Sequence, residues 1–220
     1  MYTLQSQKEK AKKIIEILKK LYPKTEKFLH FSNHFELLVA VILSAQTTDK
    51  KVNEVTARLF KKYKNLNDYV KADLQEFQKD IQQIGLYKTK AKNILQTAQI
   101  IKEKYHGAIP NTMEEMIELP GVGRKTANVV LGYAHKIVEG IAVDTHVTRL
   151  AQLYGLSFSS DPKKIEQDLM KILPKEEWFD FTNRMIAYGR EYCPAKKHEH
   201  KTCPLALLSE SLQQDKKQVG

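Results

Sequence analysis

The residues best suited to chemistry lie in a glycine-containing turn, LPGVG, and in the polar run RKTAN that follows it directly. Gly121 and Gly123 can take positive backbone dihedrals that turn successive N–H groups outward, and such a turn suits a phosphate. Arg124 and Lys125 then open a helix at the end where the helix dipole disfavours cations, so helix stability does not explain them. Arg124 suits a phosphate, and Lys125 carries an amine that can act as a nucleophile. The alternatives are a turn that only joins two helices and a solvated surface lysine.

The elements that must position this turn are helices, because apolar residues recur three or four apart in nearly every segment and no segment alternates as a strand. The fold class is therefore predicted to be all-α. Asp144 is well placed to cap one helix, and Asp161-Pro162 to start another. No repeat or linker marks a boundary, so periodicity alone favours one helical domain. Helices are expected over residues 11–21, 35–43, 52–63, 74–84, 91–101, 113–117, 124–130, 147–154, 165–172 and 178–188.

The composition narrows the class of partner. The chain has 220 residues and a formal net charge of +10, which favours an acidic partner such as nucleic acid or an anionic membrane surface. No apolar run reaches the roughly 18 residues that a membrane span needs, and the N-terminus is charged too early for a signal peptide. We therefore expect an intracellular protein, either cytoplasmic or associated with the nucleoid. Its two cysteines are too few for a disulfide framework.

Four segments in order carry a family resemblance: LVAVILSAQTTDKKVN, IGLYKTKAKNI, LPGVGRKTANVVL and IAVDTHVTRL. Together they resemble the helix-hairpin-helix DNA glycosylases, and specifically the endonuclease III branch. The resemblance implies a base excision repair enzyme that removes oxidised pyrimidines from double-stranded DNA and also cleaves abasic sites. It further implies two helical lobes. One is a barrel over 27–137 with the helix-hairpin-helix at about 112–134, and the other joins 1–26 to 138–220.

The same resemblance assigns the chemistry. Lys125 matches the family's nucleophile, and Asp144 matches the carboxylate that assists it. The target base is flipped out of the duplex, the neutral amine attacks as the base leaves, and the resulting Schiff base permits β-elimination. Asp144 can deprotonate the amine and stabilise positive charge on the sugar. A helix cap and a catalytic carboxylate are compatible roles for one residue.

Further positions match family residues that contact DNA. Gln46 matches the residue that fills the gap left by the extruded nucleotide, Leu86 matches the apolar wedge in the opposite strand, and Tyr87 lies beside it. His146 matches a residue at the pocket. Taken without the family, Gln46 is an ordinary residue at a helix end, Leu86 an exposed turn residue and His146 a capping or packing histidine. The predicted DNA-binding set is Gln46, Leu86, Tyr87, Gly121, Gly123, Arg124 and His146.

The sequence departs from the family where many members hold a [4Fe-4S] cluster with four cysteines. In that register stand Cys193, His200, Cys203 and Ser209, so only two thiolates remain and a hydroxyl binds iron weakly. We therefore expect no stable cluster and assign no cofactor and no metal ligand. Zinc held by Cys193, His198, His200 and Cys203 is an alternative with an unusual spacing. The other alternative is a loop without metal, whose lysines face the DNA backbone. These lysines are Lys196, Lys197 and Lys201.

Two rival functions stay open at this point. One is a monofunctional glycosylase, for instance of the adenine-removing branch, but Ala40 stands where that branch places its catalytic glutamate. The other is a DNA-binding protein without catalysis that kept the hairpin, which would have no chemical need for Lys125 together with Asp144. A monomer is expected, because extrusion of one base needs one active site.

Overall fold

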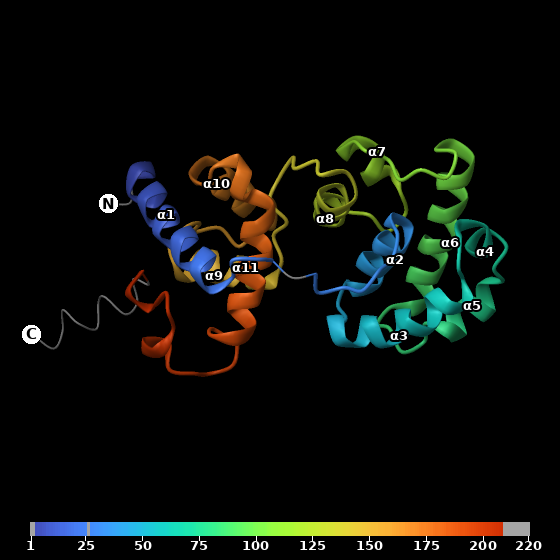
Figure 1. Ribbon diagram of the computed structural model, residues 1–220, viewed down its shortest axis with the longest axis horizontal. Helices are drawn as coiled ribbons and strands as arrows, with labels where there is room; N and C mark the ends of the chain where they lie inside the picture. The colour runs from blue at the N-terminus through green and yellow to red at the C-terminus, as the bar shows by residue number, and fades with distance from the viewer. Residues whose placement is uncertain (1–2, 26, 209–220) are drawn as a thin grey trace, which may run out of the picture. The chain divides into compact units, whose positions relative to one another are not determined.

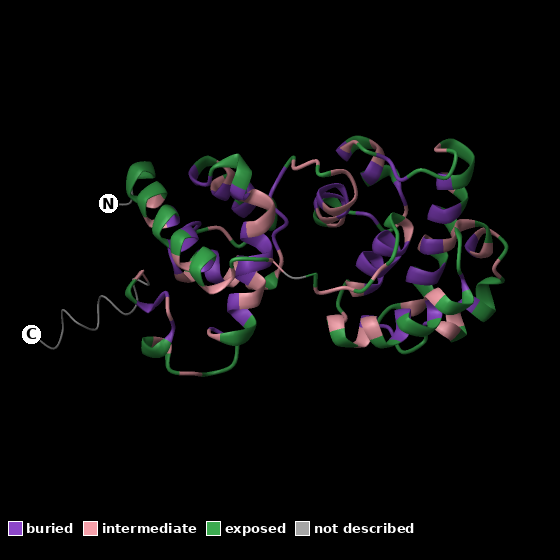
Figure 2. Cartoon of the chain, viewed as in Figure 1, coloured by how far each residue is buried: buried purple, intermediate pink, exposed green. Residues whose placement is uncertain are grey.

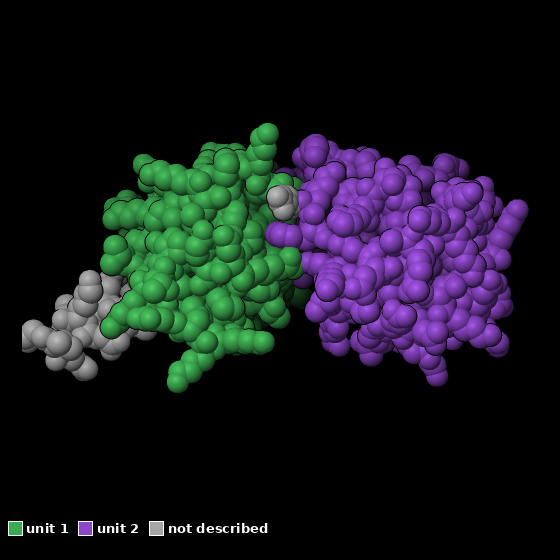
Figure 3. All heavy atoms as spheres, turned by 60° about the horizontal axis from the view of Figure 1, so that its bottom comes forward, with its two compact units in different colours: residues 1–26, 140–220 green, residues 27–139 purple. Residues whose placement is uncertain are grey.

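The computed structural model describes residues 3–25 and 27–208, and in this part of the chain the regular structure is entirely helical (Figure 1). The predicted all-α class is confirmed. The chain divides into two compact units (Figure 3): unit 1 comprises Met1–Glu26 with Gly140–Gly220, and unit 2 comprises Lys27–Glu139. Hydrophobic periodicity carries no signal of this division, because both units are built from helices with the same kind of apolar stripe. No helix of the described residues is both long and apolar enough to cross a membrane.

Unit 2 is built around one central helix, α2 (His34–Ser44), whose residues from Glu36 to Leu43 are all buried (Figure 2). Helices α3, α6 and α8 pack against it. A helix that is apolar nearly all round belongs in a core, which explains why α2 takes the middle of the unit. The other helices of the unit are α3 (Asp49–Lys62), α4 (Leu66–Val70), α5 (Leu74–Asp80), α6 (Tyr87–Lys104), α7 (Met113–Glu118) and α8 (Arg124–His135).

Most helices of unit 2 begin at a side-chain cap. Asn33, Thr48, Asn65, Asp73 and Thr112 each accept a backbone N–H of the helix that they precede. Such caps satisfy N–H groups that have no partner inside the helix. The exceptions among the described helices of this unit are α6 and α8, neither of which has a side-chain cap.

Unit 1 is discontinuous in sequence. Its helices are α1 (Leu4–Leu21), α9 (Thr145–Leu153), α10 (Pro162–Ile172) and α11 (Trp178–Glu191), with 3₁₀ turns at Lys175–Glu177, His200–Thr202 and Ala206–Leu208. Helix α1 packs against α10 and α11, so the first helix of the chain shares a core with the last ones. The caps predicted from sequence are confirmed, since Asp144 begins α9 and Asp161-Pro162 begins α10.

A buried arginine joins the two sequence segments of unit 1. Arg184 in α11 is 6% exposed, and its Nε donates to the carbonyl of Tyr22 just after α1 (3.2 Å). Its two terminal nitrogens donate to Glu177 (3.1 Å) and Asp180 (3.3 Å). A buried guanidinium is stable only when its donors are paired in this way.

The helices predicted from the sequence differ from the structure in one region of unit 2. The helix predicted over 74–84 ends at Asp80, and Ile81 and Ile84 lie in a turn. Both isoleucines are buried, so their spacing imitated a helical stripe although the backbone had left the helix. The short helix α4 was not predicted, because its few residues are too short for a periodic pattern.

Candidate active site

The hairpin turn between α7 and α8 is shaped by one constrained glycine and one free one. Gly121 has φ of +80°, and a Cβ there would lie 2.9 Å from Nδ2 of Asn93 in α6. Gly123 has φ of −94° and ψ of 174°, so the expectation of a positive dihedral at both glycines is wrong for this one. A Cβ at Gly123 would meet nothing within 4 Å. Backbone strain therefore accounts for Gly121, whereas neither strain nor packing within the chain accounts for Gly123.

The turn delivers the chain into α8 with its first N–H groups uncapped. Gly123 is the N-cap residue and supplies no side chain to bind them. The hairpin itself is held from α6, because Thr97 Oγ1 donates to the carbonyl of Pro120 (3.0 Å). Arg124 and Lys125 are exposed in the first turn of α8, and no carboxylate among the described residues pairs with the Lys125 amine. The arrangement offers N–H groups without a side-chain cap, a helix N-terminus and an exposed amine in one place.

Gln46 and Leu86 share an unusual backbone conformation. Both are exposed residues other than glycine with positive φ, 55° at Gln46 and 58° at Leu86, and Leu86 is 61% exposed. Left-handed backbone costs an ordinary residue free energy and clusters at functional sites. Among the described residues His106 and Lys136 are also exposed with positive φ, so this conformation supports the assignment of Gln46 and Leu86 but does not single them out.

A buried lysine that the sequence did not single out supports the Gln46 turn. Lys90 in α6 is 5% exposed, and its Nζ donates to the carbonyls of Leu43 (2.9 Å) and Ala45 (2.5 Å) and to Thr47 Oγ1 (3.3 Å). Burial lowers the pKa of this ammonium. These bonds tie α6, whose N-cap is Leu86, to the end of α2, where Gln46 follows.

The two turns also touch directly. A Cβ at Gly85 would lie 3.4 Å from the backbone oxygen of Gln46, so the Gly85-Leu86 turn lies against the Gln46 turn. Tyr87, the first residue of α6, is half-buried and packs against the core of unit 2. Of the predicted DNA contacts, Gln46 and Leu86 are therefore brought side by side, and Tyr87 has a packing role.

Unit 1 contributes Asp144 and His146. The Asp144 carboxylate is half-buried, and its Oδ1 accepts the N–H of Val147 (2.8 Å) as the cap of α9. His146 lies against Gly189 of α11, where a Cβ would come within 2.6 Å of its Nδ1. Gly189 is a further residue that the sequence did not reveal, because its requirement comes from a helix contact distant in sequence. Both side chains are thus fixed by their own unit.

The loop after α11 gathers the two cysteines of the chain with two histidines. The potential ligand atoms of Cys193, His198, His200 and Cys203 all lie within 4.8 Å of one another, and both cysteines are buried as free thiols. Burial, with the charges of His198 and Arg149, lowers the pKa of His200. This group can hold a metal ion, so the expectation of no metal is not confirmed. Ser209, the fourth position of the family's register, lies outside the described residues.

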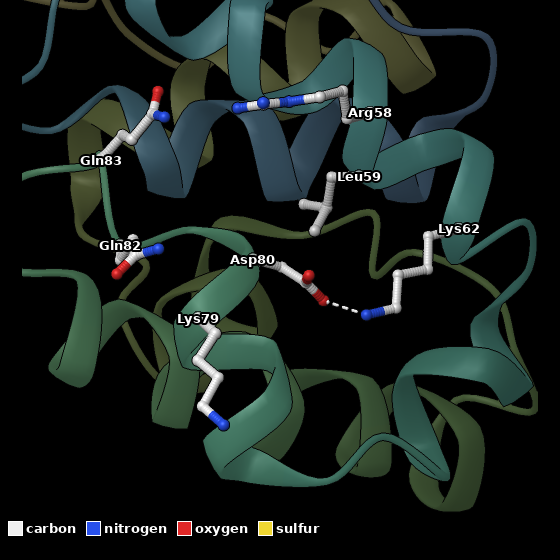
Figure 4. Close-up of a pocket in the computed structure, with 7 residues that line it drawn as sticks. All are labelled: Arg58, Leu59, Lys62, Lys79, Asp80, Gln82 and Gln83. Carbon is white, nitrogen blue, oxygen red and sulfur yellow. Dashed lines mark hydrogen bonds and ion pairs between the residues drawn. The ribbon is translucent and has the colours of Figure 1, made fainter.

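A hollow of about 240 Å³ in unit 2 contains none of the predicted site residues (Figure 4). Lys62 in its wall is held by Asp80 (2.6 Å) and Glu76 (2.7 Å), which raise the pKa of the ammonium. Because none of the predicted site residues lines this hollow, we do not assign it to the active site. Its lining residues are Arg58, Leu59, Lys62, Lys79, Asp80, Gln82 and Gln83.

Comparisons with known proteins agree with this geometry. The family model for HhH-GPD superfamily base excision DNA repair proteins matches residues 39–175. The chain is 46% identical to an endonuclease III of Synechocystis over 94% of this chain and 95% of the relative. It is 47% identical to an endonuclease III of Bacillus subtilis over 90% of each chain.

Solved structures give the same result. A non-covalent endonuclease III–DNA complex superposes with a TM-score of 0.89 at 41% identity, covering 99% of this chain and 100% of the other. A thermostable thymine-DNA glycosylase, at 22% identity and a TM-score of 0.78 over 94% of this chain and 98% of the other, shares the fold.

The fold, the hairpin and the family match define a helix-hairpin-helix protein of the base excision DNA repair superfamily. Within that superfamily, the chain belongs to the endonuclease III family, since identity above 40% runs over nearly the whole length of its relatives. It is accordingly a DNA glycosylase and AP lyase of base excision repair, as the sequence predicted.

Proposed function

We propose that the protein removes oxidised pyrimidine bases from double-stranded DNA and cleaves the resulting abasic site through a Schiff base on Lys125. The observation that carries this proposal is the placement of the Lys125 amine, exposed and without a carboxylate partner among the described residues, in the uncapped first turn of α8. A relative at 41% identity, with a TM-score of 0.89, has been solved as a trapped endonuclease III–DNA covalent intermediate. A covalent intermediate requires such a nucleophile.

The chemistry follows from an amine and a carboxylate. The neutral Lys125 amine attacks the anomeric carbon, the glycosidic bond breaks, and the base leaves with a proton. Ring opening gives a protonated Schiff base, and removal of a proton from the neighbouring sugar carbon expels the 3′ phosphate by β-elimination. Water then hydrolyses the Schiff base and frees the amine. Asp144 accepts the proton from Lys125 and stabilises positive charge on the sugar.

The DNA contacts fall into two kinds. The hairpin presents backbone N–H groups at Gly121 and Gly123 and the guanidinium of Arg124, which suit a phosphate of the backbone. Gln46 and Leu86, exposed on strained turns, suit insertion into the base stack when a nucleotide is extruded. Because the protein has a formal net charge of +10, its affinity for duplex DNA should fall steeply as the salt concentration rises. His146 near Asp144 would line the pocket for the flipped base.

The proposed substrate also bears on location and assembly. An enzyme that repairs chromosomal DNA works inside the cell, in the cytoplasm or on the nucleoid. One extruded nucleotide occupies one active site, so we propose that the protein acts as a monomer.

Two duplex substrates test the proposal. We expect release of thymine glycol, and strand cleavage at a preformed abasic site that leaves a β-elimination product. Adenine opposite oxidised guanine should not be released. Release of that adenine would indicate a monofunctional glycosylase instead, and tight binding of the abasic duplex without cleavage would indicate a DNA-binding protein.

A further inference from the structure

The loop between α11 and the last 3₁₀ turn collects four side chains around one point. Cys193 Sγ lies 3.7 Å from Nδ1 of His200, and the rings of His198 and His200 stand 4.1 Å apart between centroids. The ligand atoms of these residues and Cys203 lie within 4.8 Å of one another. A tetrahedral zinc ion, with Zn–S of about 2.3 Å and Zn–N of about 2.0 Å, places sulfur and nitrogen ligands about 3.5 Å apart. The loop already approaches that spacing.

The cluster that many family members hold does not fit these residues. A [4Fe-4S] cluster is bound by four thiolates, each on a different iron, and this chain has two cysteines in total. The four donor atoms converge on a single centre rather than surrounding a cube of separate irons. The donor set of two sulfurs and two imidazole nitrogens is instead one that zinc takes in structural sites.

His198 is oriented as a metal ligand would be. Its Nδ1 lies 2.9 Å from the carbonyl of Lys196, an acceptor only, so Nδ1 carries the proton and donates it. Its Nε2 is buried and has no hydrogen-bond partner in the described part of the chain. Metal-binding histidines usually donate the second ring N–H to a carbonyl or carboxylate, which fixes the tautomer and leaves the other nitrogen for the metal. In the cluster register of the family, position 198 is not a ligand.

The two sulfurs are fixed by helices of unit 1. Cys193 is fully buried, and Arg149 of α9 donates to its Sγ (3.6 Å) and its carbonyl (2.5 Å). Cys203 is 5% exposed, with Sγ 3.0 Å from the carbonyl of Tyr192. The donors of Arg149 suit a thiolate, so the site is supported from outside its ligands.

We propose that Cys193, His198, His200 and Cys203 form a tetrahedral Zn²⁺ site that fastens this loop to α9 and α11. Binding replaces the two thiol protons, which go to solvent, and the divalent ion with two thiolates and two neutral imidazoles leaves the site without net charge. The site takes over, with another metal, the part of the chain in which the family's cluster register lies. Its role is structural, because four protein ligands leave no open position for substrate.

Metal analysis of the full-length protein tests this proposal independently of activity. Protein is produced in medium containing both iron and zinc, purified with a thiol reductant, and analysed for both metals by mass spectrometry. We expect about one zinc per chain and no stoichiometric iron. Iron near four equivalents with a broad visible absorption, or neither metal even after zinc is added back, would overturn the proposal.

Variants identify the ligands. His198→Gln and Cys193→Ser should each weaken zinc binding, measured against a competing chelator, by at least about tenfold, since even outer partners of a metal site contribute that much. His30→Gln changes an exposed histidine of unit 2, and Ser209→Ala changes the position that the cluster register would use. Both should bind zinc like the parent. Loss of zinc from Ser209→Ala but not from His198→Gln would contradict the assigned ligand set.

A measurement on the unaltered chain covers the case in which ligand variants fail to fold. Co²⁺ replaces Zn²⁺ in the metal-free protein, and a tetrahedral sulfur and nitrogen site gives intense visible bands with charge transfer from thiolate. We expect these bands to appear up to one equivalent of Co²⁺ and to vanish when Zn²⁺ is added. The weak spectrum of octahedral Co²⁺ throughout the titration would overturn the proposal.

Discussion

The two units hold their candidate site residues in opposite ways. In unit 2, Gln46, Leu86 and Lys125 are exposed, and each stands at or beside a helix end. In unit 1, Asp144 and His146 are half-buried and held by contacts within the unit. Exposed groups on strained or uncapped turns are suited to a partner that arrives from outside, whereas packed groups keep one fixed position.

The exposed turns of unit 2 depend on support that is itself buried. Lys90 ties the end of α2 to α6, and Asn93 fills the space beside Gly121. Strained backbone persists only where its surroundings hold it. In unit 2, the residues proposed to contact DNA and the residues that hold them in place are therefore different.

The largest effect is expected in unit 1, from Asp144→Asn. Base release and abasic-site cleavage should fall by about 10²- to 10⁴-fold, because the amide cannot accept a proton. Thermal stability should stay near that of the parent, since asparagine caps helices as well as aspartate does. Single-turnover assays on a thymine glycol duplex measure the activity, and a melting curve measures the thermal stability.

The matched control is Asp161→Asn, which alters the cap of α10 in the same unit and should keep full activity. If Asp144→Asn were equally active, Asp144 would be a helix cap and nothing more.

The support of unit 2 is broken by Lys90→Met. The carbonyls of Leu43 and Ala45 lose a buried donor, so the free energy of unfolding should fall by about 1–3 kcal/mol. Lys92→Met, an exposed change in the same helix, should leave it within about 0.5 kcal/mol. Urea denaturation compares them, and equal stability of the two variants would show that Lys90 supports nothing.

Substitutions at the two glycines of the hairpin should affect the stability of the protein differently. Gly121→Ala forces a side chain into left-handed backbone and against Asn93, and should lower the free energy of unfolding by about 1–3 kcal/mol. Gly123→Ser meets nothing within 4 Å and supplies a cap for α8, so stability should hold or rise slightly.

Gly123→Ser should also change DNA binding. The serine hydroxyl competes for the N–H groups that we assign to phosphate, so Gly123→Ser should weaken duplex binding by a few fold, in keeping with the roughly 1 kcal/mol of one hydrogen bond. Fluorescence anisotropy at fixed salt measures it. Unchanged affinity would exclude these N–H groups as a phosphate site.

Local features of the fold and site could be predicted from the sequence. Periodicity and caps predict the helices, and Asp144 and Asp161-Pro162 mark the starts of two of them. The LPGVG run predicts the hairpin. These signals lie within a few residues of what they determine. The helix predicted to 84 shows the limit, because buried isoleucines beyond Asp80 keep the pattern without the backbone.

Features that depend on distant contacts could not be predicted. Lys90 looks like any other lysine until the chain folds and its amine meets carbonyls more than forty residues away. Gly189 is required because His146 on another helix leaves no room for a side chain there. His198 could be noted as a donor, but its tautomer and the convergence with Cys203 follow only from the folded loop.

The most direct test of the central claim is borohydride trapping on a thymine glycol duplex with the parent enzyme, Lys125→Gln and the control Lys102→Gln, an exposed lysine of unit 2. Borohydride reduces a Schiff base to a stable amine, so the adduct reports the nucleophile itself. We predict a covalent adduct with the parent and with Lys102→Gln, and none with Lys125→Gln. An adduct of equal yield with Lys125→Gln, or none with any of the three despite binding, would contradict the account.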